Sequence, residues 1–469
     1  MFKLDTIISL AKRRGFVFQS SEIYGGINGC WDYGPLGVEL LLNIKKIWWH
    51  EMTSRTNIEG LDASILMHPK VWEASGHLTQ FSDPMIDNKI SKARYRADNL
   101  IEDFIEKLRK KNKNDLADEC EQRLEHAQEP SDYYKIIMDY GINDPVSGNA
   151  DWTEVRNFNL MFKTFIGPLD DAASTIYLRP ESAQGIFVNF KNVMECGRQK
   201  IPFGIAQIGK AFRNEINTKN FLFRTREFEQ MEMQFFVKPG EEKEWFDYWK
   251  EQRWNWYVKY GMKPEKLRWK EHEKLAHYAN YAVDIEFEFP FGFGEIEGIH
   301  SRTDFDLSAH QKLSGKKLEY IDANTKERYT PYVVETSGGV SRGLMAFLCN
   351  AYDEEDTGEG DKRTVLHLHN SLAPIKCAVF PLVNKDGMPE KAQAIYEDLQ
   401  KYFKVQYDVS GAIGRRYRRQ DEIGTPYCVT IDGDTMSDNT VTIRDRDTMQ
   451  QEKINADNLK MYLFDKLHK

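Results

Sequence analysis

The fold is decided by residues 207–236, QIGKAFRNEINTKNFLFRTREFEQMEMQFF, which predict two β-strands joined by a long polar loop. The first strand is expected to end in Arg213 and Glu215, and the second to begin at Arg226. Because side chains alternate between the two faces of a strand, one face of the second strand is polar apart from a single aromatic ring. That face carries Arg226, Phe228, Gln230 and Glu232.

This polar face is unsuited to an ordinary hydrophobic core, because buried charges need partners. We expect the partner to be a ligand with phosphates, a flat base and an amine. The opposite face mixes charged and apolar residues, so it is not expected to form a clean core surface either. It carries Glu227, Glu229, Met231, Met233 and Phe235. A surface hairpin with solvated charges is the alternative interpretation.

Length and composition predict a large protein of two or three domains that is located in the cytoplasm. The chain has 469 residues, of which 41% are hydrophobic and 13% aromatic, enough for a sizeable core. No apolar run approaches the length of a membrane span, and residues 1–16 make a poor signal peptide, so no membrane association is expected. The net charge of −9 argues against binding nucleic acid over the whole surface, although it permits a local basic patch.

The six cysteines are scattered, and none lies within four residues of another. Zinc knuckles need closely spaced pairs of ligands, so no zinc is expected. The two histidines of the HLH segment, His367 and His369, would share one face of a strand, and without a third ligand nearby a structural role is favoured over metal binding.

Several other segments have recognisable organisation. Residues 36–52 form a helix so apolar that it needs another surface, either the core or a second subunit. Residues 94–127 are charged and helical, which fits either a solvated surface helix or contact with a nucleic-acid backbone. Residues 283–299 alternate like a strand, with Phe293, Glu295 and Glu297 on one face. The acidic, glycine-rich residues 353–362 are expected to form a loop.

Residues 331–350, PYVVETSGGVSRGLMAFLCN, predict a strand, a glycine-bearing turn and a helix. Arg342 then lies in the first turn of that helix, where the backbone favours anions and a guanidinium adds a bidentate donor. Near residue 373 the pattern changes to alternating strands and helices, which indicates a separate α/β domain of ordinary size.

These segments together resemble class II aminoacyl-tRNA synthetases. FRNE, a loop and RTREFEQME resemble the second signature of that class, GGVSRG is similar to the third, and the helix after YGPLG resembles the first, which forms a dimer interface there. More narrowly, the chain resembles glycyl-tRNA synthetases of the homodimeric type from Gly15 to its end. The segments that carry this closer resemblance are WDYGPLG, VWEASGH, FNLMF, LRPESAQG, FRTREFEQME and RRYRRQDEIGTPYCVTID.

The resemblance implies an α+β fold, in which helices flank an antiparallel sheet rather than a parallel one. It divides the chain into a catalytic domain at 1–370 and a mixed α/β anticodon-binding domain at 371–469. A charged, largely helical insertion is expected within the catalytic domain at about 86–150.

The resemblance also implies an activity, namely ATP-dependent activation of glycine to glycyl-adenylate and transfer of glycyl to the 3′ end of its tRNA. The implied partners are glycine, ATP with Mg²⁺, the tRNA for glycine and a second copy of the chain. A synthetase for serine, threonine or proline is one alternative, and it would need a side-chain pocket. A non-catalytic, synthetase-like nucleic-acid-binding accessory protein is another, and it would be expected to lack the arginines that grip ATP.

The residues implied for the nucleotide begin with Arg213 and Arg342, which are expected to be catalytic. Glu295 is the expected Mg²⁺ ligand. The implied ATP-binding residues are Arg213, Asn214, Glu215, Phe223, Arg224, Thr225, Arg226, Glu227, Phe228, Glu295, Ile296, Gly339, Val340, Ser341 and Arg342.

The resemblance implies two further sets of residues. The glycine-binding set is Arg96, Glu181, Phe228, Glu229, Gln230, Met231, Glu232, Glu335, Thr336, Ser337, Gly338 and Gly339. The tRNA-binding set is Arg415, Arg416, Arg418 and Arg419, which surround Tyr417, and a solvated helix is the alternative for it.

These residue types suit the implied chemistry. Attack of a carboxylate on the α-phosphorus needs no protein nucleophile, so positioning and neutralisation of charge carry the rate. Clustered carboxylates repel one another, and a bound ammonium relieves that repulsion. Glycine is smaller than every competitor, so a closely packed pocket selects it by exclusion and no editing domain is required.

Overall fold

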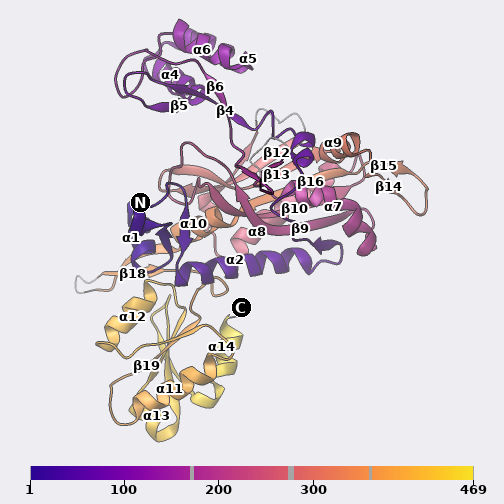
Figure 1. Cartoon of the computed structure of the whole chain (residues 1–469). Coiled ribbons are helices and arrows are strands. Elements are labelled where there is room, and N and C mark those ends of the chain that lie inside the picture. Colours follow the sequence, from indigo (N-terminus) through magenta and orange to yellow (C-terminus); the bar gives the residue numbers. More distant parts are fainter. Residues whose placement is uncertain (1, 169–173, 273–278, 359–361, 468–469) are drawn as a thin grey trace. The chain divides into compact units, whose positions relative to one another are not determined.

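The computed structural model describes residues 2–168, 174–272, 279–358 and 362–467. They form two compact units, one made of residues 1–67 and 181–469, the other of residues 68–180. The larger unit is built around a seven-stranded sheet in the order β11-β12-β13-β16-β10-β9-β3 (Figure 1). Its strands are β3 Ile58–Gly60, β9 Phe203–Phe212, β10 Glu227–Val237, β11 Leu267–Glu271, β12 Tyr281–Phe289, β13 Gly292–Thr303 and β16 Tyr332–Gly339.

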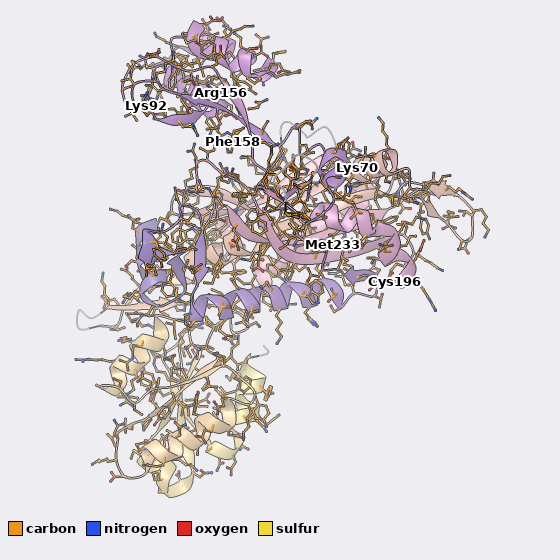
Figure 2. All side chains as sticks on the ribbon, in the orientation of Figure 1. Lys70, Lys92, Arg156, Phe158, Cys196 and Met233 are labelled. Carbon is orange, nitrogen blue, oxygen red and sulfur yellow. The ribbon has the colours of Figure 1, made fainter. Side chains whose placement is uncertain are left out.

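This sheet is antiparallel except at its edge, where β3 runs parallel to β9. One face packs on a large hydrophobic core shared with three helices, α2 Pro35–Thr53, α8 Glu242–Lys259 and α10 Val340–Ala351. The other face packs on a smaller core with α7 Ala183–Cys196 and α9 Phe305–Ser314. Figure 2 shows Met233 on β10 within the sheet and Cys196 at the end of α7.

The two central strands are shorter than the sequence suggests. β9 ends at Phe212 and β10 begins at Glu227, so Arg213, Glu215 and Arg226 belong to the connecting loop. The ladder nevertheless continues one step, because the Arg213 amide donates to the Arg226 carbonyl at 2.9 Å. That step keeps Arg213 in register with the polar face of the hairpin.

The expectation for the opposite face of β10 is wrong over most of its length. Met231, Met233 and Phe235 are buried in the large core, and only Glu227 and Glu229, at the start of the strand, keep access to solvent. The change occurs because α10 packs against β10, and Met231, Met233 and Phe235 join the same hydrophobic core as the apolar residues of that helix.

A β-bulge overturns another expectation, that Glu295 and Glu297 share a face. Glu286 pairs with Glu295 while Ile285 pairs with Glu297, which leaves Ile296 as the extra residue. Ile296 is buried in the large core, and Glu297 is buried against Arg253 of α8, whose Nε donates at 2.6 Å. Glu295 is thereby released to the other side of the sheet.

The remaining elements of the larger unit form its C-terminal domain or lie at residues 4–33 and 320–366. The domain's sheet has the order β20-β19-β21-β22-β23, with β19 parallel to β20 and β21 and the rest antiparallel. Its elements are β19 Cys377–Pro381, α11 Met388–Leu399, β20 Val405–Tyr407, α12 Ile413–Asp421, β21 Tyr427–Ile431, α13 Gly433–Asp438, β22 Thr440–Asp445, β23 Gln451–Asn455 and α14 Leu459–Leu467. The others are α1 Leu4–Arg13, β1 Val17–Gln19, β2 Trp31–Tyr33, β14 Tyr320–Ile321, β15 Arg328–Tyr329, β17 Tyr352–Asp356 and β18 Lys362–Leu366.

The predicted loop at 353–362 is therefore a strand over its first four residues, because β17 pairs antiparallel with β18. Residues 359–361 of that prediction lie outside the described residues. All six cysteines are free thiols. None of the described helices combines the length and apolar character that crossing a membrane requires.

The smaller unit has a core of its own and a three-stranded sheet in the order β5-β4-β6. It covers residues 68–180 and so extends beyond the insertion expected at 86–150. Residues on the two sides of that expected range, in β4 and β6, pair with each other. Its elements are α3 Pro69–Ala74, β4 Ser82–Asp87, β5 Arg94–Arg96, α4 Ala97–Lys110, α5 Asn114–His126, α6 Pro130–Asp139, β6 Arg156–Asn159, β7 Lys163–Phe165 and β8 Thr175–Tyr177.

Candidate active site

A cavity of about 340 Å³ lies over the polar end of the central sheet. One face of β10 is apolar at Phe236, which packs against α7. Toward the start of the strand, near the first residues of α7, the same face carries polar side chains. The cavity is lined by Glu181, Arg213, Glu215, Leu222, Phe223, Arg224, Thr225, Phe228, Gln230, Glu232, Glu295, Gly298, His300, Arg302, Glu335, Ser337, Gly339, Ser341 and Arg342.

The start of α7 fixes the floor of this cavity. The Ser182 amide donates to Gln230 Oε1 at 3.0 Å, and the Ser182 hydroxyl donates to Glu232. Gln207, buried on β9, donates to the Ser182 carbonyl at 2.8 Å and accepts from the Ala63 amide at 2.6 Å. These bonds satisfy buried polar groups and hold the floor residues in one geometry.

At one end of the cavity, the carboxylate of Glu335 is held ionised by its neighbours. It accepts hydrogen bonds from Arg302 at 3.0 Å and Gln234 at 2.7 Å, and it contacts His300 Nδ1 at 2.9 Å. Burial raises its pKa, but the charge of Arg302 and the bond and charge of His300 outweigh burial and bring the pKa to about 2.

Glu232, the neighbouring carboxyl, is perturbed in the opposite direction. Burial and the negative charges of Glu335 and Glu181 raise its pKa well above the usual value, and the bond from Ser182 offsets this only in part. One carboxyl is thus charged and the pKa of its neighbour is raised, which is how close carboxylates avoid mutual repulsion. The arrangement suits a ligand that brings a positive charge, such as an ammonium.

A second layer of buried groups supports this end. Arg302 donates to Asp306 at 2.8 and 3.1 Å, and the Gln184 amide donates to Asp306 and Glu181, both at 2.9 Å. His310 Nε2 lies 2.8 Å from Gln184 Oε1, so this nitrogen carries the proton. Burial lowers the pKa of His310, consistent with a neutral ring.

The other end of the cavity holds two arginine–aromatic pairs. The Arg213 guanidinium lies 5.3 Å from the centre of the Phe228 ring, and that of Arg342 lies 4.4 Å from the Phe223 ring. Arg342 also donates to the Glu295 carbonyl at 2.9 Å and lies 3.3 Å from the Glu295 carboxylate. Two flat cations facing two rings provide charge for phosphates and surfaces on which a base can stack.

Comparisons with known proteins agree with this geometry. Residues 162–351 match the family model for the tRNA synthetase class II core domain (G, H, P, S and T), and residues 376–466 match the anticodon binding domain. Residues 83–127 and 113–160 match glycyl-tRNA synthetase insertion domain 1.

Relatives match over almost the whole length. The glycine–tRNA ligase of Chlorobaculum tepidum is 58% identical over 99% of this chain and 100% of its own, and that of Treponema denticola is 56% identical over 96% and 94%. The Staphylococcus aureus enzyme is 55% identical over 99% of this chain and 98% of its own. The chain belongs to the glycine–tRNA ligase family. The predicted family and the predicted class II fold are thereby confirmed.

Most positions expected of a glycine–tRNA ligase meet in the one cavity, from both the nucleotide set and the glycine set. Some predicted positions are not among the described residues that line it: Asn214, Arg226, Glu227, Glu229, Met231, Ile296, Thr336, Gly338 and Val340. The alternation of strands explains several of these, since Glu229 projects from the opposite face and pairs with Lys45 of α2 at 3.1 Å. Arg226 instead donates to the carbonyls of Glu215 and Asn28, and these bonds hold the loop between β9 and β10 in place.

Arg96 and the four predicted tRNA-binding arginines are not among the residues that line this cavity. Arg96 belongs to the smaller unit, where it pairs with Asp83 at 3.0 Å and Asp98 at 2.5 Å. Of the α12 arginines, Arg415 is exposed, Arg419 pairs with Asp408 at 2.6 Å and Arg418 lies 3.6 Å from Asp421. Arg416 is buried, and its guanidinium donates to the carbonyls of Gly411 and Pro381.

Four residues of this network were not predicted from the sequence, namely His300, Arg302, Gln184 and Asp306. The sequence does place His300 and Arg302 on alternate positions of the same strand as Glu295, which could have indicated that they share one face. The bulge at Ile296 shifts the alternation by one, which brings both side chains to the face of the cavity.

Proposed function

We propose that this chain is an ATP-dependent ligase that activates glycine as its adenylate and transfers glycyl to the 3′ end of the tRNA for glycine. The observation that carries the proposal is the division of one cavity between a carboxylate end and an arginine–aromatic end. An amino acid whose ammonium lies among Glu181, Glu232 and Glu335 directs its own carboxylate toward Arg213. The names of the full-length relatives support the same activity.

The reaction needs positioning rather than a protein nucleophile. The glycine carboxylate attacks the α-phosphorus of ATP, the bond to pyrophosphate breaks, and negative charge builds on the phosphoryl oxygens. Arg213 and Arg342 stabilise that charge, and the rings of Phe228 and Phe223 hold the base. In the second step a hydroxyl of the terminal ribose attacks the adenylate carbonyl and AMP leaves.

Glu295 fits the role of a magnesium ligand. Burial raises its pKa, but the charges of Arg342, His300 and Arg213 lower it overall, so its carboxylate is ionised beside the nucleotide end. Carboxylates are ligands that Mg²⁺ prefers, and Mg²⁺ bound with ATP would neutralise part of the phosphate charge.

Amino-acid-dependent exchange of pyrophosphate into ATP tests the proposal. Exchange should occur with glycine and fall steeply with alanine or serine, because selection of the smallest amino acid by exclusion requires a pocket that a methyl group would overpack. An absence of exchange with glycine would contradict the ligase and favour the non-catalytic accessory protein. Equal exchange with alanine would contradict selection by exclusion.

Glycine binding should release a proton from Glu232. Its raised pKa means that the empty cavity holds a proton there to a higher pH than an ordinary glutamate would. A bound ammonium favours the carboxylate, so glycine affinity should increase as pH rises toward that pKa. Calorimetry in two buffers of different ionisation enthalpy measures the released proton. The Glu232→Gln variant, which has no such proton, should show no buffer dependence, and buffer dependence that persists in it would refute the assignment.

Arg415 and Arg416 should separate tRNA contact from stability. We propose Arg415, the exposed member of α12, as a contact to the tRNA backbone, so Arg415→Ala should weaken charging of tRNA but leave glycine-dependent exchange unchanged. Arg416→Ala should instead lower the free energy of unfolding by about 1–3 kcal/mol, because buried carbonyls lose their donor. Urea unfolding and charging assays on both variants distinguish the two roles, and equal stability of the two variants would contradict them.

We propose a homodimer formed through α2. The helix buries Leu40, Leu41 and Ile44 in the core but leaves Val38 and Leu42 at 42% and 51% exposure. A glutamate at an apolar interface is costly, so Leu42→Glu should shift the chain from dimer to monomer in sedimentation velocity. The control Met461→Glu changes an apolar residue on α14 that is 59% exposed, and it should leave the assembly intact. A Leu42→Glu chain that sediments like the unmodified protein would rule out this interface.

A further inference from the structure

Three metal-binding side chains meet beside the carboxylate end of the cavity. His272 directly follows β11, Asp284 lies on β12 and His300 lies on β13. One donor atom from each lies within 4.8 Å of the others. The sheet register produces this cluster, since β12 lies between β11 and β13 and Asp284 is diagonal to both histidines.

Gly298 leaves room for the side chains of Asp284 and His300, because it has no side chain of its own. Gly298 pairs with Asp284 across the strands, and a Cβ at Gly298 would lie 2.7 Å from the His300 ring and 3.4 Å from Asp284 Oδ1. Any side chain there would displace the imidazole. The His300 imidazole and the Asp284 carboxylate therefore lie over a backbone position that carries no side chain.

His300 is oriented by a carboxylate on its other nitrogen. Its Nδ1 lies 2.9 Å from Glu335 Oε1, and a carboxylate oxygen accepts hydrogen bonds, so Nδ1 carries the proton. The lone pair then lies on Nε2, which would be 3.1 Å from a Cβ at Gly298. A carboxylate that bonds the outer nitrogen of a metal-binding histidine is the usual support of such ligands. His272 Nε2, on the other side, lies 2.8 Å from Asp284 Oδ2.

The other histidine cluster lacks these features. In it His367 lies near Glu355 and Asp353, but both of its ring nitrogens already face carboxylates, Asp447 at 2.5 Å and Glu355 at 2.8 Å. That cluster also offers a single imidazole beside two carboxylates, a donor set less suited to transition-metal ions than two imidazoles and one carboxylate. It is therefore a matched control for the cluster at His300.

We propose that His272, Asp284 and His300 bind one divalent transition-metal ion of the zinc, cobalt or nickel kind. Two imidazoles and one carboxylate suit such ions, whereas Mg²⁺ and Ca²⁺ prefer an all-oxygen shell. The side chains are 32%, 13% and 21% exposed, so an ion has access from solvent and a fourth position is open to water. Because Glu335 supports His300, a bound ion acts on the carboxylate end of the cavity through a shared residue.

Titration of the full-length protein with Co²⁺, after removal of metals by a chelator, tests this site. We expect one Co²⁺ per chain, with the visible absorption of a low-coordinate site, displaced by an equivalent of Zn²⁺. His272→Ala and Asp284→Asn should each weaken binding by at least about tenfold, and His367→Ala should leave it unchanged. Asp284→Asn keeps the side-chain shape, and a melting curve for each variant shows that it is folded.

Three results would overturn the proposal. They are the absence of stoichiometric Co²⁺ binding, binding that His272→Ala and Asp284→Asn leave unchanged, and binding that is lost in His367→Ala. None of these readouts uses glycine or ATP, so they are independent of the proposed ligase activity.

Discussion

Replacing Arg213 by alanine should lower glycine-dependent pyrophosphate exchange by about 10²–10³-fold. Arg213 follows β9 directly, lines the cavity and lies over the Phe228 ring, and its proposed role there is to stabilise charge that develops on the α-phosphate. Such an interaction is made mainly in the transition state, so the turnover number should fall while the KM for glycine changes little. Exchange kinetics at saturating ATP and varied glycine measure this.

Lys210→Ala is the matched control, because Lys210 lies near the end of β9, three residues before Arg213. It pairs with Glu227 on the opposite face and has an exposed side chain. Its removal should leave the exchange rate within about twofold, as expected for an exposed ion pair. A similar loss in both variants would mean that the strand, and not the guanidinium at the cavity, sets the rate. Arg213→Lys should recover only part of the activity, because an ammonium lacks the planar fork.

Replacing Arg302 by methionine should lower the free energy of unfolding by about 3–5 kcal/mol and abolish glycine binding. The guanidinium is 7% exposed and is shared by two carboxylates, Asp306 and Glu335. Removing one partner of a buried ion pair leaves uncompensated charge in a region that water does not solvate. The pKa of Glu335 should then rise, because the positive charge that opposes burial is gone.

Arg268→Met tests whether burial is the cause. Arg268 also pairs with a carboxylate on the sheet, Glu286, but its side chain is 51% exposed. The same substitution should therefore change stability by no more than about 1 kcal/mol. Urea unfolding of both variants gives the comparison, and equal losses would refute a special role for the Arg302 network.

Much of the site is predictable from residues 207–236 because alternation along a strand is a local rule. Phe228, Gln230 and Glu232 share a face in the sequence and line one cavity in the structure. The same rule gives the wrong face for residues after Glu295, because the extra residue at Ile296 moves every later side chain of the strand to the other face of the sheet. A bulge depends on the partner strand, which lies outside the local pattern.

The α12 arginines illustrate a second limit. Arg415 and Arg416 are neighbours of identical chemistry, and composition treats both as candidates for RNA contact. The packing of α12 on its sheet leaves Arg415 exposed and buries Arg416 against the carbonyls of Pro381 and Gly411. Which of two adjacent guanidiniums meets solvent depends on the helix's orientation, and that is a tertiary property.

The sequence by itself determined the family, the class II fold and the hairpin that carries Arg213, Phe228 and Glu232, because these depend on local spacing and motif. Only the tertiary structure decided what surrounds that hairpin. It placed Arg302 and His300 on Glu335, separated the pKa values of Glu232 and Glu335, and drew His272 and Asp284 next to His300. The physical reason is that charge coupling and ligand convergence act through space over a few ångströms, between residues that lie far apart along the chain.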